Sequence, residues 1–121
     1  MGGSPIDQDT REMLEELSDG TSSFFDEVLE TFMSDVDGAL ERLNAAYASD
    51  DRKGVRFHAH RFRSASASIG ALVLSEHCAE LEGIAEQDAG SLEAAWNKVQ
   101  DETARVLSWV EVNRPTLGIA C

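Results

Sequence analysis

The chain has 121 residues, which is enough for one domain with a self-sufficient core and too few for a second independent core. Its 10 basic and 23 acidic residues give a net charge of −13 at neutral pH, which disfavours general binding to nucleic acids or to anionic membranes. Hydrophobic residues make up 42% of the chain, a share that favours a folded domain over a disordered acidic tail.

The two cysteines, Cys78 and Cys121, lie far apart in the sequence and provide neither a disulfide framework nor a zinc-binding spacing. A reducing, cytoplasmic environment fits this pattern. No apolar run approaches the roughly 20 residues that span a bilayer, and the first residues do not resemble a signal peptide. We therefore expect a cytoplasmic location.

Prolines and apolar residues together predict a chain of five helices. The two prolines, Pro5 and Pro115, lie near the ends, so the chain between them is free to be helical. A first, short helix is expected over residues 7–17, with Asp19-Gly20 as its stop signal. Its apolar residues are Met13, Leu14 and Leu17.

A second helix of about 25 residues is predicted from Ser23 onward, because apolar residues recur there every three or four positions. These residues are Phe25, Val28, Leu29, Phe32, Val36, Leu40, Leu43 and Tyr47. The stretch 48–51 is expected to form a turn whose aspartates cap the next helix.

The same spacing predicts three further helices. The third runs from about Arg52 to Ile69, where Gly70 ends it, and its apolar face consists of Val55, Ala59, Phe62, Ser66 and Ile69. The fourth stops at 88–90, and its apolar face consists of Leu74, Cys78, Leu81 and Ala85. The fifth begins at Ser91 and ends at 113–115, and its apolar face consists of Leu92, Trp96, Val99, Val106 and Val110.

No segment alternates apolar and polar residues as a half-buried strand does. The predicted fold is therefore all-α: an antiparallel four-helix bundle (up-down-up-down) over residues 7–113, with the short N-terminal helix capping one end. Residues 1–6 and 114–121 are expected to be tails.

The charge pattern singles out the third helix. No acidic residue occurs from Arg52 through Ser75, although half of the ten basic residues lie there: Arg52, Lys53, Arg56, Arg61 and Arg63. The rest of the chain has five basic and 23 acidic residues, a net charge of 5 − 23 = −18. Such a basic island is often only a solvated helix face, but on an acidic protein it can also mark a site for an anion or an acidic partner.

Two histidines lie inside the basic island, His58 and His60. On a helix they are about 200° apart, so they cannot bind one metal ion from the same face. The phase of the apolar face places His60 toward solvent, on the same side as Arg63. An exposed imidazole is substantially neutral at cytoplasmic pH and can attack phosphorus, while a nearby guanidinium can stabilise the transferring phosphoryl group.

Other chemistries fit the sequence less well. Serines surround His60, but no nucleophile elbow or orienting acid supports a Ser-His hydrolase. The absence of a Glu-x-x-His pair disfavours a helical di-metal enzyme, and no phosphate-binding loop indicates an ATP site. The main alternative is a non-catalytic interaction module whose basic island binds an acidic partner.

The residues around His60 also resemble a known signature. Residues 59–71 read A-H-R-F-R-S-A-S-A-S-I-G-A, and Leu74, Cys78 and Leu81-Glu82 follow. This stretch is similar to the pattern of the histidine-containing phosphotransfer (HPt) domain, A-H-x-L-K-G-S-S-x-x-L/I-G-A followed by L-x-x-x-C-x-x-L-E. The resemblance implies that His60 exchanges a phosphoryl group with receiver-domain aspartates of response regulators in a two-component phosphorelay.

The resemblance also implies roles for His60's neighbours. Arg63 matches the basic residue, usually Lys, that stabilises the phosphoryl charge, and Ser64 replaces the usual glycine. Glu82 matches the residue that orients the imidazole from the next helix. The expected partner-binding residues are Arg56, Phe57, Ser64 and Ala67.

The same resemblance implies a phosphotransfer intermediate that is not itself an enzyme with an ATP site. It would hold no metal and no cofactor, because the receiver domain supplies the Mg²⁺. The expected partners are receiver domains, a hybrid sensor histidine kinase, or both, with no nucleic acid and no membrane involved. We expect a monomer, either separate in the cytoplasm or as the cytoplasmic domain of a larger sensor kinase.

Overall fold

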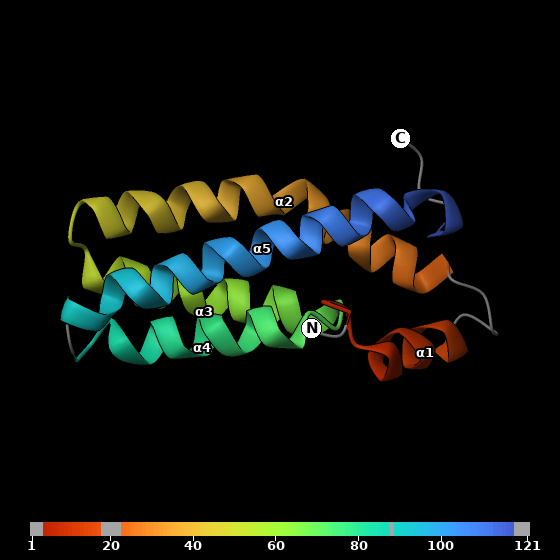
Figure 1. Ribbon diagram of the computed structural model, residues 1–121, viewed down its shortest axis with the longest axis horizontal. Coiled ribbons are helices and arrows are strands. Elements are labelled where there is room, and N and C mark those ends of the chain that lie inside the picture. Colours follow the sequence, from red (N-terminus) through yellow and green to blue (C-terminus); the bar gives the residue numbers. More distant parts are fainter. Residues whose placement is uncertain (1–3, 18–22, 88, 118–121) are drawn as a thin grey trace.

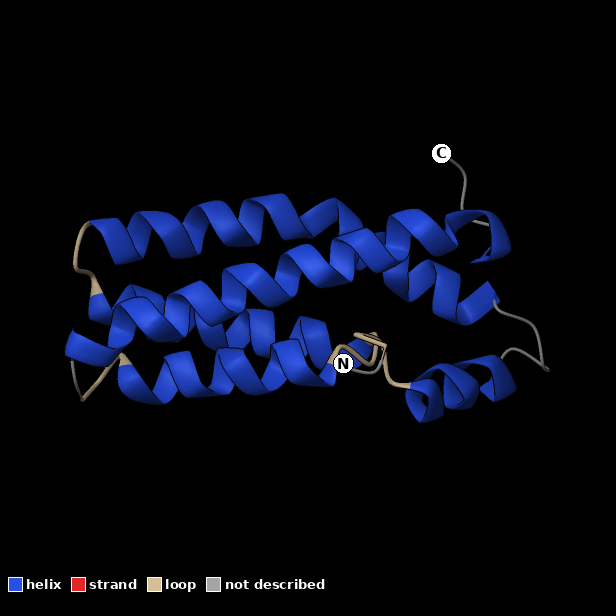
Figure 2. Cartoon of the chain, in the orientation of Figure 1, coloured by secondary structure: helices blue, strands red, loops and turns tan. Residues whose placement is uncertain are grey.

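The computed structural model describes residues 4–17, 23–87 and 89–117, and within these ranges it is helical and contains no strand (Figures 1 and 2). The helices are α1 (Gln8–Leu17), α2 (Ser23–Ala48), α3 (Arg52–Ser68), α4 (Leu72–Ile84) and α5 (Ala89–Leu117). The predicted all-α class is therefore confirmed.

The four long helices form the predicted antiparallel bundle. Successive helices run in opposite directions, and α3 packs against α2 on one side and against α4 on the other (Figure 1). The short helix α1 lies at the end of the bundle where α2 begins, as expected for a cap. Within the described residues, no helix combines the length and the apolar character needed to cross a bilayer.

Burial confirms the apolar faces that the spacing predicts for α3, α4 and α5. All the residues predicted for these faces are buried in one core, with Phe25, Leu29, Phe32, Val36 and Leu43 of α2. Of the apolar residues of α1, Leu14 is buried and Met13 is 54% exposed. A helix of ten residues at the end of a bundle packs on one side only, and Leu14 occupies that side. Leu17's side chain lies outside the described part.

Three predicted helix boundaries need correction. Helix α4 ends at Ile84, short of the expected stop at 88–90, and a turn follows in which the Gln87 N–H donates to the Ile84 carbonyl. Helix α5 begins at Ala89, before Ser91, because the first N–H groups of a helix need no partner within it. It also continues past Pro115 to Leu117, so Pro115 lies in the last turn, where the lost hydrogen bond and the crowding of the carbonyl four residues earlier affect only the end of the helix.

Two turns fix α3 in place. At its start, the side chain of Asp51 accepts a 3.0 Å hydrogen bond from the Gly54 N–H, which is the predicted cap. At its end, Gly70 has a φ of 80°, which favours glycine. The Gly70 carbonyl accepts a 2.6 Å hydrogen bond from the Asp7 N–H, and the neighbouring Ile6, the last residue of the expected tail, is buried. The segment before α1 is thereby attached to the α3–α4 turn.

Two glycines test this account of the turn. A Cβ on Gly70 would lie 3.0 Å from the Thr10 Cβ and would be strained by the positive φ, so Gly70→Ala should lower the free energy of unfolding by about 1–2 kcal/mol. Gly83 is the matched control, because a Cβ there meets no atom within 4 Å and Gly83→Ala should stabilise α4 by up to about 1 kcal/mol. Urea unfolding followed by circular dichroism measures both changes. Equal effects at the two glycines would contradict this account.

Candidate functional site

His60 lies on the outer side of α3, next to α4. Its side chain is 56% exposed, and its Nδ1 is 3.1 Å from Oε2 of Glu82. Within the described residues, the other ring nitrogen, Nε2, has no hydrogen-bond partner. The imidazole is therefore held by one nitrogen and open at the other. The sequence expectation that His60 is exposed is correct.

Glu82 contacts a second residue of α3 as well. Its Oε1 accepts a 3.2 Å hydrogen bond from the Arg63 guanidinium, so one carboxylate joins the imidazole to the cation one turn further along α3. Both Arg63 and His60 retain a large exposed fraction, whereas the Glu82 side chain is only 19% exposed. A largely buried carboxylate with two partners is a well-fixed support for the ring.

The antiparallel α3–α4 pair explains why these residues meet. His60 and Glu82 lie at nearly equal distances along the chain from the Gly70 turn, so the returning helix brings Glu82 beside His60. Ser75 of α4 strengthens this alignment because its hydroxyl donates a 3.2 Å hydrogen bond to the Arg63 carbonyl. Cys78 is buried beneath the site, and its burial raises the pKa of its thiol to about 12. It is a core residue, as the sequence predicts.

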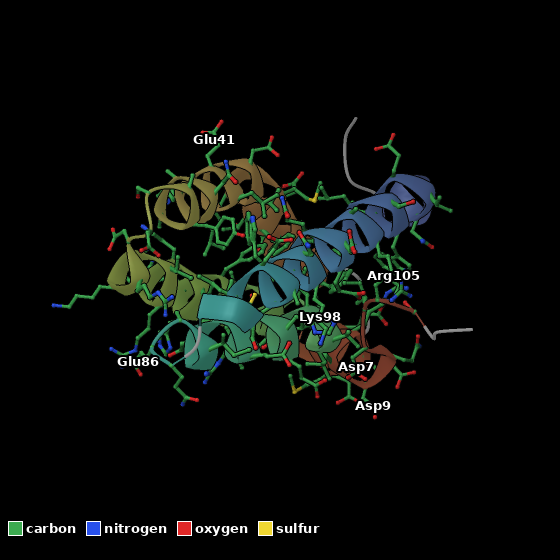
Figure 3. The ribbon with its side chains drawn as sticks, turned by 60° about the vertical axis from the view of Figure 1, so that its left-hand side comes forward. Asp7, Asp9, Glu41, Glu86, Lys98 and Arg105 are labelled. Atoms are coloured by element: carbon green, nitrogen blue, oxygen red, sulfur yellow. The ribbon has the colours of Figure 1, made fainter. Side chains whose placement is uncertain are left out.

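A hollow of about 790 Å³ lies beside His60, toward the start of α3. Its lining is rich in charge and consists of Arg52, Lys53, Arg56, Phe57, His60, Glu82, Ala85 and Glu86. Arg56 pairs with Glu86 at 3.5 Å, and Figure 3 shows Glu86 on the side of the bundle that carries the start of α3. Arg52 and Lys53 belong to the basic island that the sequence singles out, whereas sequence reasoning missed Glu86. Its signal was the spacing of four residues from Glu82, which places Glu86 on the same side although α4 ends at Ile84.

The expected docking residues surround His60 on the exposed side of α3. Phe57 is 55% exposed, which is unusual for so large an apolar side chain, and Arg56, Ser64 and Ala67 are also exposed. The Ser64 hydroxyl lies 3.4 Å from the His60 carbonyl, to which it donates. The hydroxyl is thus directed to its own helix backbone and not to the imidazole.

His58 lies on a different face of α3, toward α2. Burial lowers its pKa from the usual 6.5, and the positive charges of Arg42 and Arg61 lower it further, against a smaller opposing effect of Asp51. The two histidines are therefore separated, as their spacing predicts. Among the described residues, no group of three or more His, Cys, Asp or Glu side chains could hold a metal ion.

Comparison with known proteins identifies the family. The family model of the Hpt domain matches residues 27–111, which is more than half of the chain. This chain belongs to the Hpt domain family. It therefore has a histidine phosphotransfer role in phosphorelays, as an intermediate that interacts with receiver domains and kinases.

A solved structure has the same fold as this Hpt domain. It is the histidine-containing phosphotransfer protein B (HptB) from Pseudomonas aeruginosa PAO1, with a TM-score of 0.78 and 23% sequence identity. The match covers 94% of this chain and 98% of that chain. No curated protein sequence matches this chain.

The lowered pKa of His58 predicts a pH dependence of stability. Below pH 6.5 the unfolded chain takes up a proton at His58 before the folded chain does, so the free energy of unfolding should fall as the pH decreases. His58→Gln should remove this part of the dependence. Arg42→Gln should weaken it only partly, because burial remains the larger cause. Urea unfolding between about pH 5 and pH 7.5 measures the slopes. An unchanged slope in His58→Gln would contradict the assignment.

Proposed function

We propose that His60 carries the phosphoryl group in this Hpt domain and exchanges it with receiver-domain aspartates of response regulators. One observation carries the proposal: the exposed imidazole is held at Nδ1 by Glu82, while Nε2 has no partner among the described residues. His58 is directed toward α2, and His77 is a partly buried residue of α4. Of the three histidines, His60 is the one with this combination of support and access.

The proposed transfer step uses groups that this chain provides. The Nε2 lone pair attacks the phosphorus of an aspartyl phosphate, the bond between phosphorus and the aspartate oxygen breaks, and the aspartate leaves as a carboxylate. The proton on Nδ1 stays hydrogen-bonded to Glu82, whose negative charge offsets the positive charge that the ring gains. Donation to a second receiver is the reverse of this step.

Glu82 and Arg63 have different roles in this proposal. Glu82 fixes the tautomer that leaves Nε2 unprotonated, because Nδ1 must donate to the carboxylate. Arg63 supplies positive charge near the phosphoryl oxygens, and its remaining N–H groups are available while one nitrogen stays on Glu82. The chain itself needs no metal or cofactor in this scheme. The receiver brings the Mg²⁺ that offsets the phosphoryl charge.

We propose that the receiver docks across the exposed side of α3. Phe57 offers apolar contact area beside His60, and Arg56 borders the hollow that can receive acidic side chains. Ser64 and Ala67 are small and leave the approach to the ring open. The partner is a receiver domain or a hybrid sensor histidine kinase. We propose a monomer that works in the cytoplasm, without nucleic acid, membrane or an ATP site of its own.

Substitution of each histidine tests the proposal. His60→Gln should abolish phosphoryl acceptance, because an amide has no nucleophilic nitrogen, and should change stability by no more than about 0.5 kcal/mol. His58→Gln and His77→Gln are the matched controls and should retain transfer. The measurement is label transfer from a phosphorylated receiver to each variant, with circular dichroism to verify folding.

The chemistry of the product separates transfer from simple binding. Phosphate on a histidine should be labile to acid and stable to base, whereas a non-catalytic interaction module would bind a receiver without taking up label. Label on a folded His60→Gln variant, or loss of transfer in His58→Gln alone, would contradict the assignment.

Ser64 tests the direction from which the receiver approaches. Ser64→Gly should leave transfer intact or quicken it, because it removes a small exposed group near the ring. Glycine is the poorer helix former, so the variant should be about 0.5 kcal/mol less stable. Ser64→Leu should block transfer because a bulky side chain would stand between the receiver and the ring. Transfer rates measured for both variants against wild type decide the matter. A leucine variant that transfers normally would show that the receiver docks elsewhere.

A further inference from the structure

Helix α4 binds Arg63 of α3 at both ends of the residue. The Ser75 hydroxyl donates a 3.2 Å hydrogen bond to the Arg63 carbonyl, and Glu82 accepts a 3.2 Å hydrogen bond from the Arg63 guanidinium. Ser75 and Glu82 are seven positions apart, which is about two helical turns, so both lie on the face of α4 that contacts α3 (Figure 1). The two helices are therefore connected at Arg63 through its backbone and through its side chain.

The two contacts differ in how strictly they fix one helix against the other. A guanidinium lies at the end of a long side chain with many rotamers, so it can follow Glu82 when α4 shifts. The hydroxyl of Ser75 has a short reach and binds a backbone atom, so its hydrogen bond forms only at one alignment of the helices. Apolar packing between the helices is non-directional. Within the described residues, no other side chain of α4 hydrogen-bonds to the backbone of α3.

The alignment of α4 bears on which nitrogen of His60 carries the proton. Glu82 lies 3.1 Å from Nδ1, and a carboxylate accepts a hydrogen bond only from a ring nitrogen that is protonated. This distance is near the long end of the usual range for such bonds, about 2.7–3.2 Å, so a small shift of Glu82 breaks the contact. The ring can then place its proton on Nε2, where no lone pair remains for attack on phosphorus.

We propose that Ser75 is a positioning residue for the His60 imidazole, an inference that rests on the proposed phosphotransfer function. Its hydrogen bond to the Arg63 carbonyl keeps α4 at the alignment in which Glu82 reaches Nδ1. The Ser75 side chain is half-buried and does not line the hollow beside His60. Ser75 therefore acts through Arg63 and Glu82, without contact to the phosphoryl group or the receiver.

Ser66 provides a matched control for Ser75. Its hydroxyl also donates to a carbonyl of α3, that of Phe62 at 2.7 Å, but Ser66 belongs to α3 itself. Ser66 is fully buried, so Ser66→Ala perturbs the core at least as much as Ser75→Ala without removing a link between helices. Both variants replace serine with a better helix former and should remain folded, which circular dichroism verifies.

Nuclear magnetic resonance of the His60 ring nitrogens tests the proposal without a partner. Their chemical shifts give the fraction of rings that carry the proton on Nδ1, measured at about pH 9, where an ordinary imidazole is neutral. Ser75→Ala should lower this fraction about twofold, because the hydrogen bond that holds the alignment is lost. Ser66→Ala should leave the fraction at the wild-type value. The ring of His58, on another face of α3, is the internal reference and should not change.

Transfer kinetics then connect the tautomer with the reaction. Label transfer from a phosphorylated receiver is followed at a series of receiver concentrations for wild type and both variants. Ser75→Ala should lower the maximal rate by the same factor as the fraction of rings with the proton on Nδ1, since only these rings have a nucleophilic Nε2. The half-saturating receiver concentration should change less than about 1.5-fold, because the docking surface is intact.

Three outcomes would overturn the proposal. An unchanged fraction in Ser75→Ala would show that Ser75 does not position the ring. Equal decreases in Ser75→Ala and Ser66→Ala would mean a general loosening of the bundle. Slower transfer that comes only from a higher half-saturating concentration would assign Ser75 to receiver docking. A wild-type protein that takes up no label on His60 would instead contradict the phosphotransfer proposal alone, because the ring measurement needs no receiver.

Discussion

The carboxylate of Glu82 is the contact on which the functional side of this bundle depends. It holds Nδ1 of His60 and the guanidinium of Arg63 at 3.1 and 3.2 Å, although these residues are in different turns of α3. Both contacts require α4 to keep one alignment against α3. The Gly70 turn and the Ser75 hydrogen bond to the Arg63 carbonyl maintain that alignment. The chemistry of an exposed ring is thus set by a largely buried group on another helix.

Helix α3 combines three different surfaces in 17 residues. One packs in the core through Val55, Ala59 and Phe62, and this burial supplies the hydrophobic stabilisation of the helix. A second faces α4 and presents His60, while a third faces α2 with His58. Because the basic island contains no acidic residue, its cations lie on both sides of the buried face of α3.

Periodicity predicts the buried faces of α3, α4 and α5 because helical spacing and hydrophobic burial leave a strong pattern in the sequence. The two ends of α5 were harder to predict, since Ser91 and Pro115 allow a helix to begin or end at several neighbouring positions. The place of His60 on an exposed side also follows from helical phase. Helical phase does not predict that one carboxylate contacts both His60 and Arg63. Those contacts depend on the alignment of two helices and on side-chain rotamers.

The hollow of about 500 Å³ between α2 and α3 could not be predicted from the sequence for a related reason. Arg42 lies outside the basic island, and only the packing of α2 against α3 brings it to Arg61. Local patterns of charge describe one helix at a time. A surface that two helices share can be predicted only when their tertiary arrangement is known.

The division of charge between α3 and the remaining chain has a consequence for how fast partners associate. A negatively charged protein that approaches from most directions meets a field of the same sign, since residues outside the basic island carry a net charge of 5 − 23 = −18. Only the approach toward α3 is attractive, so long-range electrostatics rotates an acidic partner into position before any contact forms. Added salt screens this guidance over a Debye length of about 8 Å at physiological ionic strength. At higher salt, more of the encounters would occur in wrong orientations, and a smaller fraction of them would be productive.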